Sequence, residues 1–357
     1  MRYLYYKNRT KEKYLYKRRY KLIHGDKMVK IISKKPKWIG PLLVRILDRE
    51  TAEELAENPN TSPWILRWLA EYEDRWVRVA VAENTNTPPE VIAKLAKNED
   101  EEVRATVAEN TNTPPEVLAK LADDENRRVR KAVAGNSNTL PEVLAKLADD
   151  EDGDVRRAVA GNSDTPEVLI KLAEDKSELV REAVALNFNT PPEVLAKLAD
   201  DENRRVREAV ARNLKTPPEV LAKLAEDEDG DVRVAVAENH YTPELLKQLA
   251  EDKSVWVREA VALNFNTPPE VLIKLAEDKS VWVREGVARN LKTPPEVLPK
   301  LADDEDGYVR RAVARNPNTP IWVLRELEDD EFWQVREAAE RNLAKKLEDL
   351  IARTTQH

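Results

Sequence analysis

Residues 113–136 read TPPEVLAKLADDENRRVRKAVAGN, which contains two helical patterns separated by an acidic turn. The first pattern opens with a start signal: Thr113 can cap a helix, the two prolines need no backbone partner in a first turn, and Glu116 completes a capping box. Apolar residues then recur at helical spacing, at Val117, Leu118, Leu121 and Ala122. This half of the stretch therefore predicts a helix that begins after Thr113 and ends before the acidic turn.

The second half of the stretch predicts another short helix with a narrow apolar stripe. Val129, Ala132, Val133 and Asn136 follow one another at spacings of three and four. Their small side chains allow neighbouring helices to approach closely. Asn136 is expected to end this helix, because asparagine tolerates the left-handed conformation found at helix ends.

The same unit recurs along most of the chain. Eleven Val-Arg dipeptides follow one another at steps of 25 or 26 residues, with arginines at Arg78, Arg104, Arg130, Arg156, Arg181, Arg207, Arg233, Arg258, Arg284, Arg310 and Arg336. Helix pairs this short bury too little apolar surface to fold alone, so stacked neighbours must supply the core. The sequence predicts an all-α solenoid of about eleven two-helix repeats with capping units.

The predicted boundaries follow from where the repeat begins and fades. Residues 41–60 look like a degenerate N-terminal capping unit, with Asn58 and Asn60 in register, and residues 61–343 form the eleven-repeat solenoid. Residues 344–357 are expected to form a C-terminal capping helix and tail, because Leu347 and Ile351 extend the apolar pattern.

Residues 1–40 have a different composition from the array. Residues 1–45 carry 15 Lys or Arg against two acidic residues, a net charge of +13, whereas the rest of the chain has a net charge of −21. Six tyrosines lie within residues 1–20 without helical or alternating period. We expect this segment to be disordered or, as an equal alternative, residues 1–27 to lie upstream of a true start at Met28.

The recurring residues resemble known helical repeats. An Asp before the turn and the Val-Arg of the second helix resemble the HEAT repeat, and the order Val-Arg-x-Ala-Val-Ala-x-Asn, Thr-Pro, Leu-x-x-Leu-Ala is more similar to the leucine-rich repeat variant family, over about residues 60–345. That resemblance implies a right-handed superhelix in which one helix of each pair is closer to a 3₁₀-helix. The cysteine-bound cluster known in the family has no counterpart in this cysteine-free chain.

An arginine in every repeat could bind phosphate, but a structural role is favoured. Only Tyr72 and Asn98 depart from an aspartate six residues before the arginine, and a charge so regularly accompanied is expected to be paired. The HEAT resemblance implies a ladder of same-repeat pairs, which would join Asp124 with Arg130, Asp150 with Arg156, Asp175 with Arg181, Asp201 with Arg207, Asp227 with Arg233, Asp252 with Arg258, Asp278 with Arg284, Asp304 with Arg310 and Asp330 with Arg336.

The sequence contains no motif for catalysis, cofactor binding or metal binding. Three histidines, His24, His240 and His357, lie far apart, no glycine-rich phosphate loop is present, and no serine or threonine sits in a nucleophile motif. We therefore expect no catalytic, cofactor-binding or metal-binding residues. No segment resembles a membrane span or a signal peptide, so a cytoplasmic protein is expected. Abundant charged residues with few glutamines favour a thermostable protein.

Variation among the repeats marks one face. Positions two before, one after and five after each recurring arginine change from repeat to repeat and share the exposed face of the second helix, whereas the exposed first helix hardly varies. A three-repeat block also recurs, since the single-proline helix starts at Thr165 and Thr242 are 77 residues apart. In solenoids of this type the second helix lines the concave side, where ligands bind.

These observations predict a non-enzymatic scaffold that holds a protein or peptide on the concave face; its oligomeric state stays open. The candidate site combines aromatic and arginine residues, as binding hot spots do: Trp256, Trp282, Tyr308, Trp333, Leu263, Arg289, Arg315 and Arg341. Packing of these aromatic residues against the adjoining turn is the alternative. The other functional class is nucleic-acid binding by the basic N-terminal arm or by Arg127, Arg128, Arg204, Arg205, Arg212, Arg289 and Arg315, which the array's negative charge disfavours.

Overall fold

The computed structural model describes residues 47–239 and 243–354, and it confirms an all-α solenoid of stacked helix pairs. The described residues form 23 helices and no strand: a leading helix is followed by eleven pairs. The chain divides into two compact units between Leu147 and Ala148. The basic segment 1–40, Met28 and the first part of the predicted capping unit 41–60 lie outside the described residues.

The first unit contains α3 and three full pairs, followed by the first helix of a fourth pair. Their bounds are α3 Arg49–Glu57, α4 Pro63–Leu69, α5 Arg75–Glu83, α6 Pro89–Leu95, α7 Glu101–Glu109, α8 Pro115–Leu121, α9 Arg127–Gly135 and α10 Pro141–Leu147.

The second unit starts with the second helix of a pair and ends in a long helix. Its helices are α11 Gly153–Asn162, α12 Pro166–Leu172, α13 Glu178–Leu186, α14 Pro192–Leu198, α15 Arg204–Arg212, α16 Pro218–Leu224, α17 Gly230–Glu238, α18 Pro243–Leu249, α19 Val255–Leu263, α20 Pro269–Leu275, α21 Val281–Arg289, α22 Leu298–Ala302, α23 Gly307–Arg315, α24 Ile321–Leu327 and α25 Trp333–Thr354. The last helix runs without interruption through the predicted boundary at residue 343.

The first helix of each pair starts where the sequence predicts, but for a different reason. In α8 the extended residue before the helix is Pro114, Pro115 opens the helix, and no side chain caps it. Thr113 is fully buried, and its hydroxyl donates backward to the carbonyl of Val107 at the end of α7. The predicted capping box is therefore wrong: the threonine instead satisfies a carbonyl at the end of the preceding second helix.

The second helix has its own cap, which the sequence analysis missed. The Asn126 side chain accepts the backbone N–H of Arg128 at 2.8 Å, and an Asp or Asn caps most second helices from α5 to α23 in this way. Ser177, Ser254 and Ser280 occupy the same position without a side-chain cap bond. At the other end, Asn136 has φ −80° and ψ 126°, so the predicted left-handed conformation is wrong.

The asparagine at the end of each second helix joins neighbouring repeats. The buried amide of Asn290 donates to the carbonyl of Ala262 at 2.7 Å and to that of Asn264 at 2.9 Å, both in the preceding repeat. These carbonyls lie at a helix end and have no partner within their own helix. The asparagine is thus a hydrogen-bonded link between repeats and not a backbone-conformation signal.

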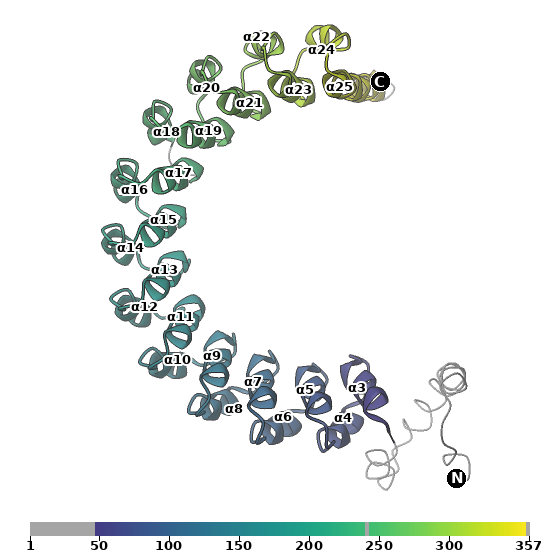
Figure 1. Ribbon diagram of the computed structural model, residues 1–357, viewed down its shortest axis with the longest axis vertical. Coiled ribbons are helices and arrows are strands. Elements are labelled where there is room, and N and C mark those ends of the chain that lie inside the picture. Colours follow the sequence, from purple (N-terminus) through teal and green to yellow (C-terminus); the bar gives the residue numbers. More distant parts are fainter. Residues whose placement is uncertain (1–46, 240–242, 355–357) are drawn as a thin grey trace, which may run out of the picture. The chain divides into compact units, whose positions relative to one another are not determined.

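Second helices form the continuous layer of each unit. Within a unit, odd-numbered helices pack on the next odd-numbered helix, while even-numbered helices pack mainly on the odd-numbered helices beside them (Figure 1). In the second unit the odd-numbered helices lie on the inner side of the arc (Figure 1). Valine, alanine and leucine from both helices of a pair build the core. Both members of the pair are α-helices, so the expected 3₁₀ character is wrong for the described residues.

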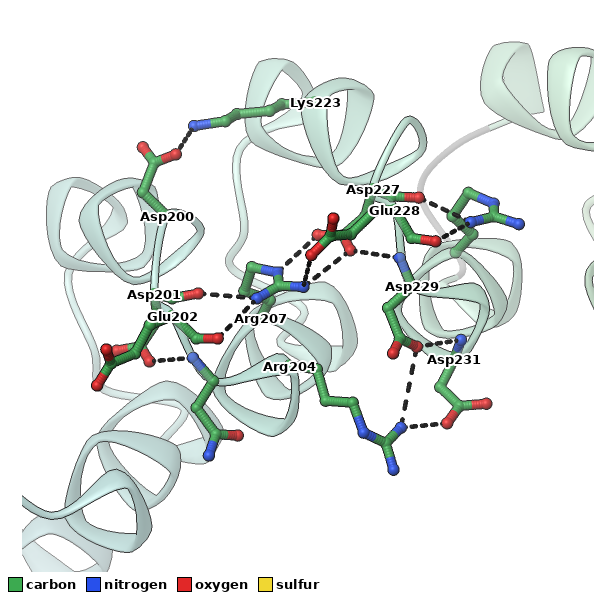
Figure 2. Close-up of polar contacts among 12 residues, drawn as sticks. Asp200, Asp201, Glu202, Arg204, Arg207, Lys223, Asp227, Glu228, Asp229 and Asp231 are labelled. Carbon is green, nitrogen blue, oxygen red and sulfur yellow. Dashed lines mark hydrogen bonds and ion pairs between the residues drawn. The ribbon is translucent and has the colours of Figure 1, made fainter.

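The arginine ladder is present, but it connects different residues from those expected. Arg207 donates from Nε to Asp227 Oδ2 at 2.7 Å and from Nη2 to Asp227 Oδ1 at 3.0 Å, and Asp227 belongs to the next repeat. Its own-repeat aspartate, Asp201, receives Nη1 only at the backbone carbonyl, at 2.9 Å (Figure 2). Same-repeat side-chain pairing is therefore wrong, because the guanidinium clamps two successive turns.

This bidentate pairing recurs through both units. The pairs are Arg104 with Asp124, Arg156 with Asp175, Arg181 with Asp201, Arg207 with Asp227, Arg233 with Asp252, Arg258 with Asp278, Arg284 with Asp304 and Arg310 with Asp330. Arg78 lacks the carboxylate partner that these arginines have. Asn98 replaces the aspartate that would face Arg78, and the buried Nε of Arg78 has no partner.

The ladder predicts loss of stability in acid. Burial alone would raise the pKa of Asp227, but hydrogen bonds from Arg207 and from the backbone N–H of Asp229, with the charges of Arg207 and Arg233, hold that pKa below its ordinary value of 3.8. Seven other ladder aspartates have pKa values shifted in the same direction for the same reasons. A carboxylate whose pKa is lower in the folded than in the unfolded protein stabilises the array at pH values above its unfolded-state pKa. This stabilisation is lost as the pH falls through its folded-state pKa.

We therefore expect the free energy of unfolding to change little from pH 7 to about 4.5, as far as the ladder is concerned, and to fall steeply below about 4. Urea unfolding at a series of pH values measures this. In Asp227→Asn the fall should be shallower by about 1.4 kcal/mol per pH unit, the contribution of one proton. An unchanged slope in that variant would contradict the role assigned to the ladder.

Candidate functional site

Equivalent positions of the second helices lie side by side in successive repeats, but the position one after the recurring arginine is mostly half-buried and Val79 is buried, so the expectation that all three variable positions are exposed is wrong for this one. Two before the recurring arginine, Arg128 Nη1 lies 3.3 Å from Glu102 of the preceding repeat. Five after it, Arg212 Nη2 lies 3.6 Å from Glu238 of the next repeat. Each variable position therefore forms a row that runs across the helices.

The aromatic row occupies the start of four successive second helices in the second unit. Trp256 of α19, Trp282 of α21, Tyr308 of α23 and Trp333 of α25 have 62%, 51%, 59% and 60% of their surface exposed. Their helices pack on one another in sequence. The approach of α19 to α21 is close, since a Cβ at Gly286 would lie 3.0 Å from Cβ of Ala262.

The residues predicted beside this row lie further along the same helices, at the helix end for Leu263, Arg289 and Arg315 but inside the long helix α25 for Arg341. Leu263 at the end of α19 and the arginines Arg289, Arg315 and Arg341 are exposed. Arg289 Nη1 lies 3.9 Å from Glu285, and Arg341 Nη2 lies 2.7 Å from Glu337, each one helical turn away. Most of the surface of both arginine side chains nevertheless stays open to solvent.

Half-buried carboxylates separate the aromatic row from these helix ends. Burial raises the pKa of Glu259 above its ordinary value, and the negative charge of Glu285 on the next helix raises that pKa further, while Arg289 opposes the rise. The side chain of Glu285 is only 15% exposed. A desolvated carboxylate with another beside it is a place where a cation from a partner would be stabilised.

Sequence reasoning missed a second set of exposed apolar residues. Phe188, Leu214, Phe265 and Leu291 follow the buried asparagine that ends α13, α15, α19 and α21 and are exposed. Other repeats mostly carry threonine, serine or proline at this turn position. That contrast was a signal in the sequence, but the position lies outside the helix, so a comparison of helix faces did not include it.

The arginines of the nucleic-acid alternative are mostly engaged by carboxylates. Arg128 pairs with Glu102 and Arg204 with Asp231, while Arg212 contacts both Glu208 at 2.9 Å and Glu238. Figure 2 shows Arg204 directed at the carboxylates of Asp229 and Asp231. These paired guanidinium groups are less available to phosphate than the sequence alone indicates.

The described residues were compared with the requirements of a metal site and of a membrane-spanning helix. Within residues 47–239 and 243–354, no three His, Asp or Glu side chains are arranged to hold a metal ion. No helix in that part of the chain is long and apolar enough to span a bilayer.

Comparison with known proteins relates the repeats to one family. The model of the leucine rich repeat variant domain matches residues 78–137, and that of the leucine rich repeat variant matches residues 178–203, 204–229 and 281–306. No curated protein matches the chain.

Among solved structures, a leucine-rich repeat variant with a novel repetitive structural motif is 31% identical over 62% of this chain and 88% of that chain, with a TM-score of 0.49. An engineered protein is 22% identical over 83% of this chain and 94% of its own, with a TM-score of 0.26. Importin beta is 15% identical over 88% of this chain and 58% of its own, with a TM-score of 0.36.

Proposed function

This chain belongs to the leucine-rich repeat variant family, and from that membership we propose that it is a non-catalytic scaffold whose second helices bind a protein partner. Repeat solenoids are typical of interaction scaffolds, because each repeat contributes one strip of an extended surface. The partner would lie across α19, α21, α23 and α25.

The aromatic row carries this proposal. Large aromatic side chains that leave half or more of their surface in water on consecutive helices are unusual unless another molecule covers them. Tryptophan, tyrosine and arginine are the residues most enriched at the energetic centres of protein interfaces. All three types meet here, since Trp282 shares α21 with the exposed Arg289 and Tyr308 shares α23 with the exposed Arg315.

The partner is proposed to be a protein and not a nucleic acid. The exposed arginines at helix ends alternate with carboxylates such as Glu285 and Glu337, and a polyanion would be repelled by them. Single-stranded nucleic acid can stack on aromatic side chains, so this class remains an outcome of the test.

The experiment compares a double variant on the second helices with a single variant on a first helix. Trp256→Ala with Trp282→Ala is expected to reduce capture of protein partners from the source lysate about 30-fold or more, while unfolding changes by about 0.5 kcal/mol or less per site. Trp322→Ala is the matched control, because Trp322 is 55% exposed but lies on the first helix α24.

Two results would count against the proposal. Equal capture by the wild type and the double variant would place the partner elsewhere, and a much lower melting temperature of the double variant would assign the row to packing. Gel shifts with single-stranded nucleic acid, at low and at moderate salt, test the other class.

A further inference from the structure

Part of the exposed face occurs twice in the second unit. Helices α13 and α15 with their turns correspond to α19 and α21 at an offset of 77 residues, three repeats along the array. The first half-site consists of Glu182, Leu186, Phe188, Glu208, Arg212 and Leu214. The second half-site consists of their equivalents Glu259, Leu263, Phe265, Glu285, Arg289 and Leu291.

These solvent-accessible residues are identical although the two copies have diverged nearby. Leu179 and Arg205 at the starts of α13 and α15 correspond to Trp256 and Trp282 at the starts of α19 and α21. The helix starts have therefore changed, while further along the same helices only the buried pair Ala209 and Gly286 differs. Both copies thus retain the same six half-site residues.

Each half-site combines apolar side chains with charged ones. Leu186, Phe188 and Leu214 in the first half-site are exposed, as are their three equivalents in the second. Each half-site also holds two glutamates and one arginine. Arg212 lies 2.9 Å from Glu208, and Arg289 lies 3.9 Å from Glu285. Along the helices two glutamates thus meet one arginine, whereas Lys215 and its equivalent Lys292 add one positive charge at the turn; Lys215 Nζ lies 5.9 Å from the centre of the Phe188 ring.

The carboxylate of Glu259 is partly removed from water. Glu259 lies on α19, which packs on α21, and burial together with the neighbouring Glu285 raises its pKa. A partner that brings a cation to this position would offset the desolvation of Glu259, and apolar side chains beside that cation would cover Leu263 and Phe265.

We propose that the two half-sites bind basic segments of a protein partner, each with a lysine or arginine flanked by apolar residues, and that one partner chain occupies both. This deepens the proposed function and rests on it, because it names the chemistry of the partner on the second helices. The flanks differ: Glu238 lies beside Arg212, whereas Arg315 occupies the equivalent place beside the second half-site.

The separation of the half-sites limits how a bivalent ligand can reach both. Three repeats at a helix spacing of roughly 8–10 Å place them about 24–30 Å apart. A fully extended chain needs about eight residues to span this distance. A flexible linker of about 20 residues has an average end-to-end distance of roughly 22–27 Å and matches it.

Fluorescent peptides provide the probe. Two copies of Leu-Arg-Phe-Lys-Leu are joined by a Gly-Ser linker of about 20 residues, and the affinity of this peptide for the full chain is compared with that of a single copy. The bivalent peptide should bind about 100-fold more tightly than the single copy, whereas two copies fused without a linker, whose centres lie only about 17 Å apart when fully extended, should give almost no gain. Glu182→Gln or Glu259→Gln alone should abolish the gain.

The control removes the same charge from the other face. Glu193→Gln with Glu219→Gln, on the exposed first turns of α14 and α16, should leave the gain intact. The proposal is overturned if this control loses as much affinity as the half-site variants, if a peptide with glutamate in place of the basic residues binds as tightly, or if linker length has no effect.

The two proposals can fail separately. If Glu182→Gln with Glu259→Gln captures lysate proteins as the wild type does, but Trp256→Ala with Trp282→Ala does not, the scaffold function stands and the basic ligand is wrong. If both double variants capture normally, the face itself is wrong.

Discussion

Replacing Asp227 with alanine is expected to lower the free energy of unfolding by about 3–5 kcal/mol, because it leaves the guanidinium of Arg207 buried without its carboxylate. The side chains of Arg207 and Asp227 are only 12% and 8% exposed, and two hydrogen bonds join them. Urea unfolding of the variant measures the loss. A change below about 0.5 kcal/mol would show that the ladder is incidental to the fold.

A double-mutant cycle separates the observed partner from the expected one. Arg207→Ala and Asp227→Ala should be strongly coupled, near the upper end of about 0.5–3 kcal/mol. Arg207→Ala and Asp201→Ala should be nearly additive, because Asp201 offers Arg207 a backbone carbonyl that alanine retains. The opposite result would restore same-repeat pairing.

Asn98 offers the reciprocal variant. Asn98→Asp supplies the carboxylate that Arg78 lacks, so it should raise the stability of the first unit, where the wild type leaves Arg78 Nε buried and unpartnered. A neutral or destabilising result would contradict the interpretation of Arg78 as an incomplete step of the ladder.

Deleting one whole repeat is expected to leave a folded, shorter array. Removal of residues 190–215 joins Asn189 to Thr216 and brings Asp227 into the position that Asp201 occupies relative to Arg181, so the bidentate pair can form again. Helical circular dichroism per residue should be unchanged, since α13 packs only on its near neighbours.

Removal of half a repeat is the matched control. Deleting residues 190–202 takes away α14 and the acidic turn but keeps α15, so neither the ladder nor the apolar face of α15 finds its partner. This variant should lose its cooperative unfolding transition. Equal folding of the two deletions would contradict a register set by inter-repeat contacts.

Most of the fold could be predicted from the sequence because its period and apolar pattern are local properties. Leu118 and Leu121 mark the buried face of α8, and the prolines at 114 and 115 mark its start. Contacts between repeats could not be assigned in the same way. An aspartate lies six residues before one arginine and 19 or 20 after another, and only the stacked helices decide which carboxylate reaches the guanidinium.

The roles of the recurring polar residues also depended on three-dimensional packing. Thr113 and Asn136 were interpreted through their own helices, whereas each bonds to a neighbouring helix. In the candidate site, helical spacing correctly identified Trp256 and Trp282 as exposed. It missed Phe265 and Leu291, because their exposure depends on a turn to which helical periodicity does not apply.

Site-specific photo-crosslinking tests most directly whether the second helices hold the partner. A photoreactive phenylalanine replaces Trp282 on α21 or Trp322 on α24, two tryptophans that are 51% and 55% exposed. Position 282 is expected to form a crosslink to a partner protein in the source lysate, and position 322 is not. Crosslinking from position 322 alone, or equally from both positions, would contradict this expectation.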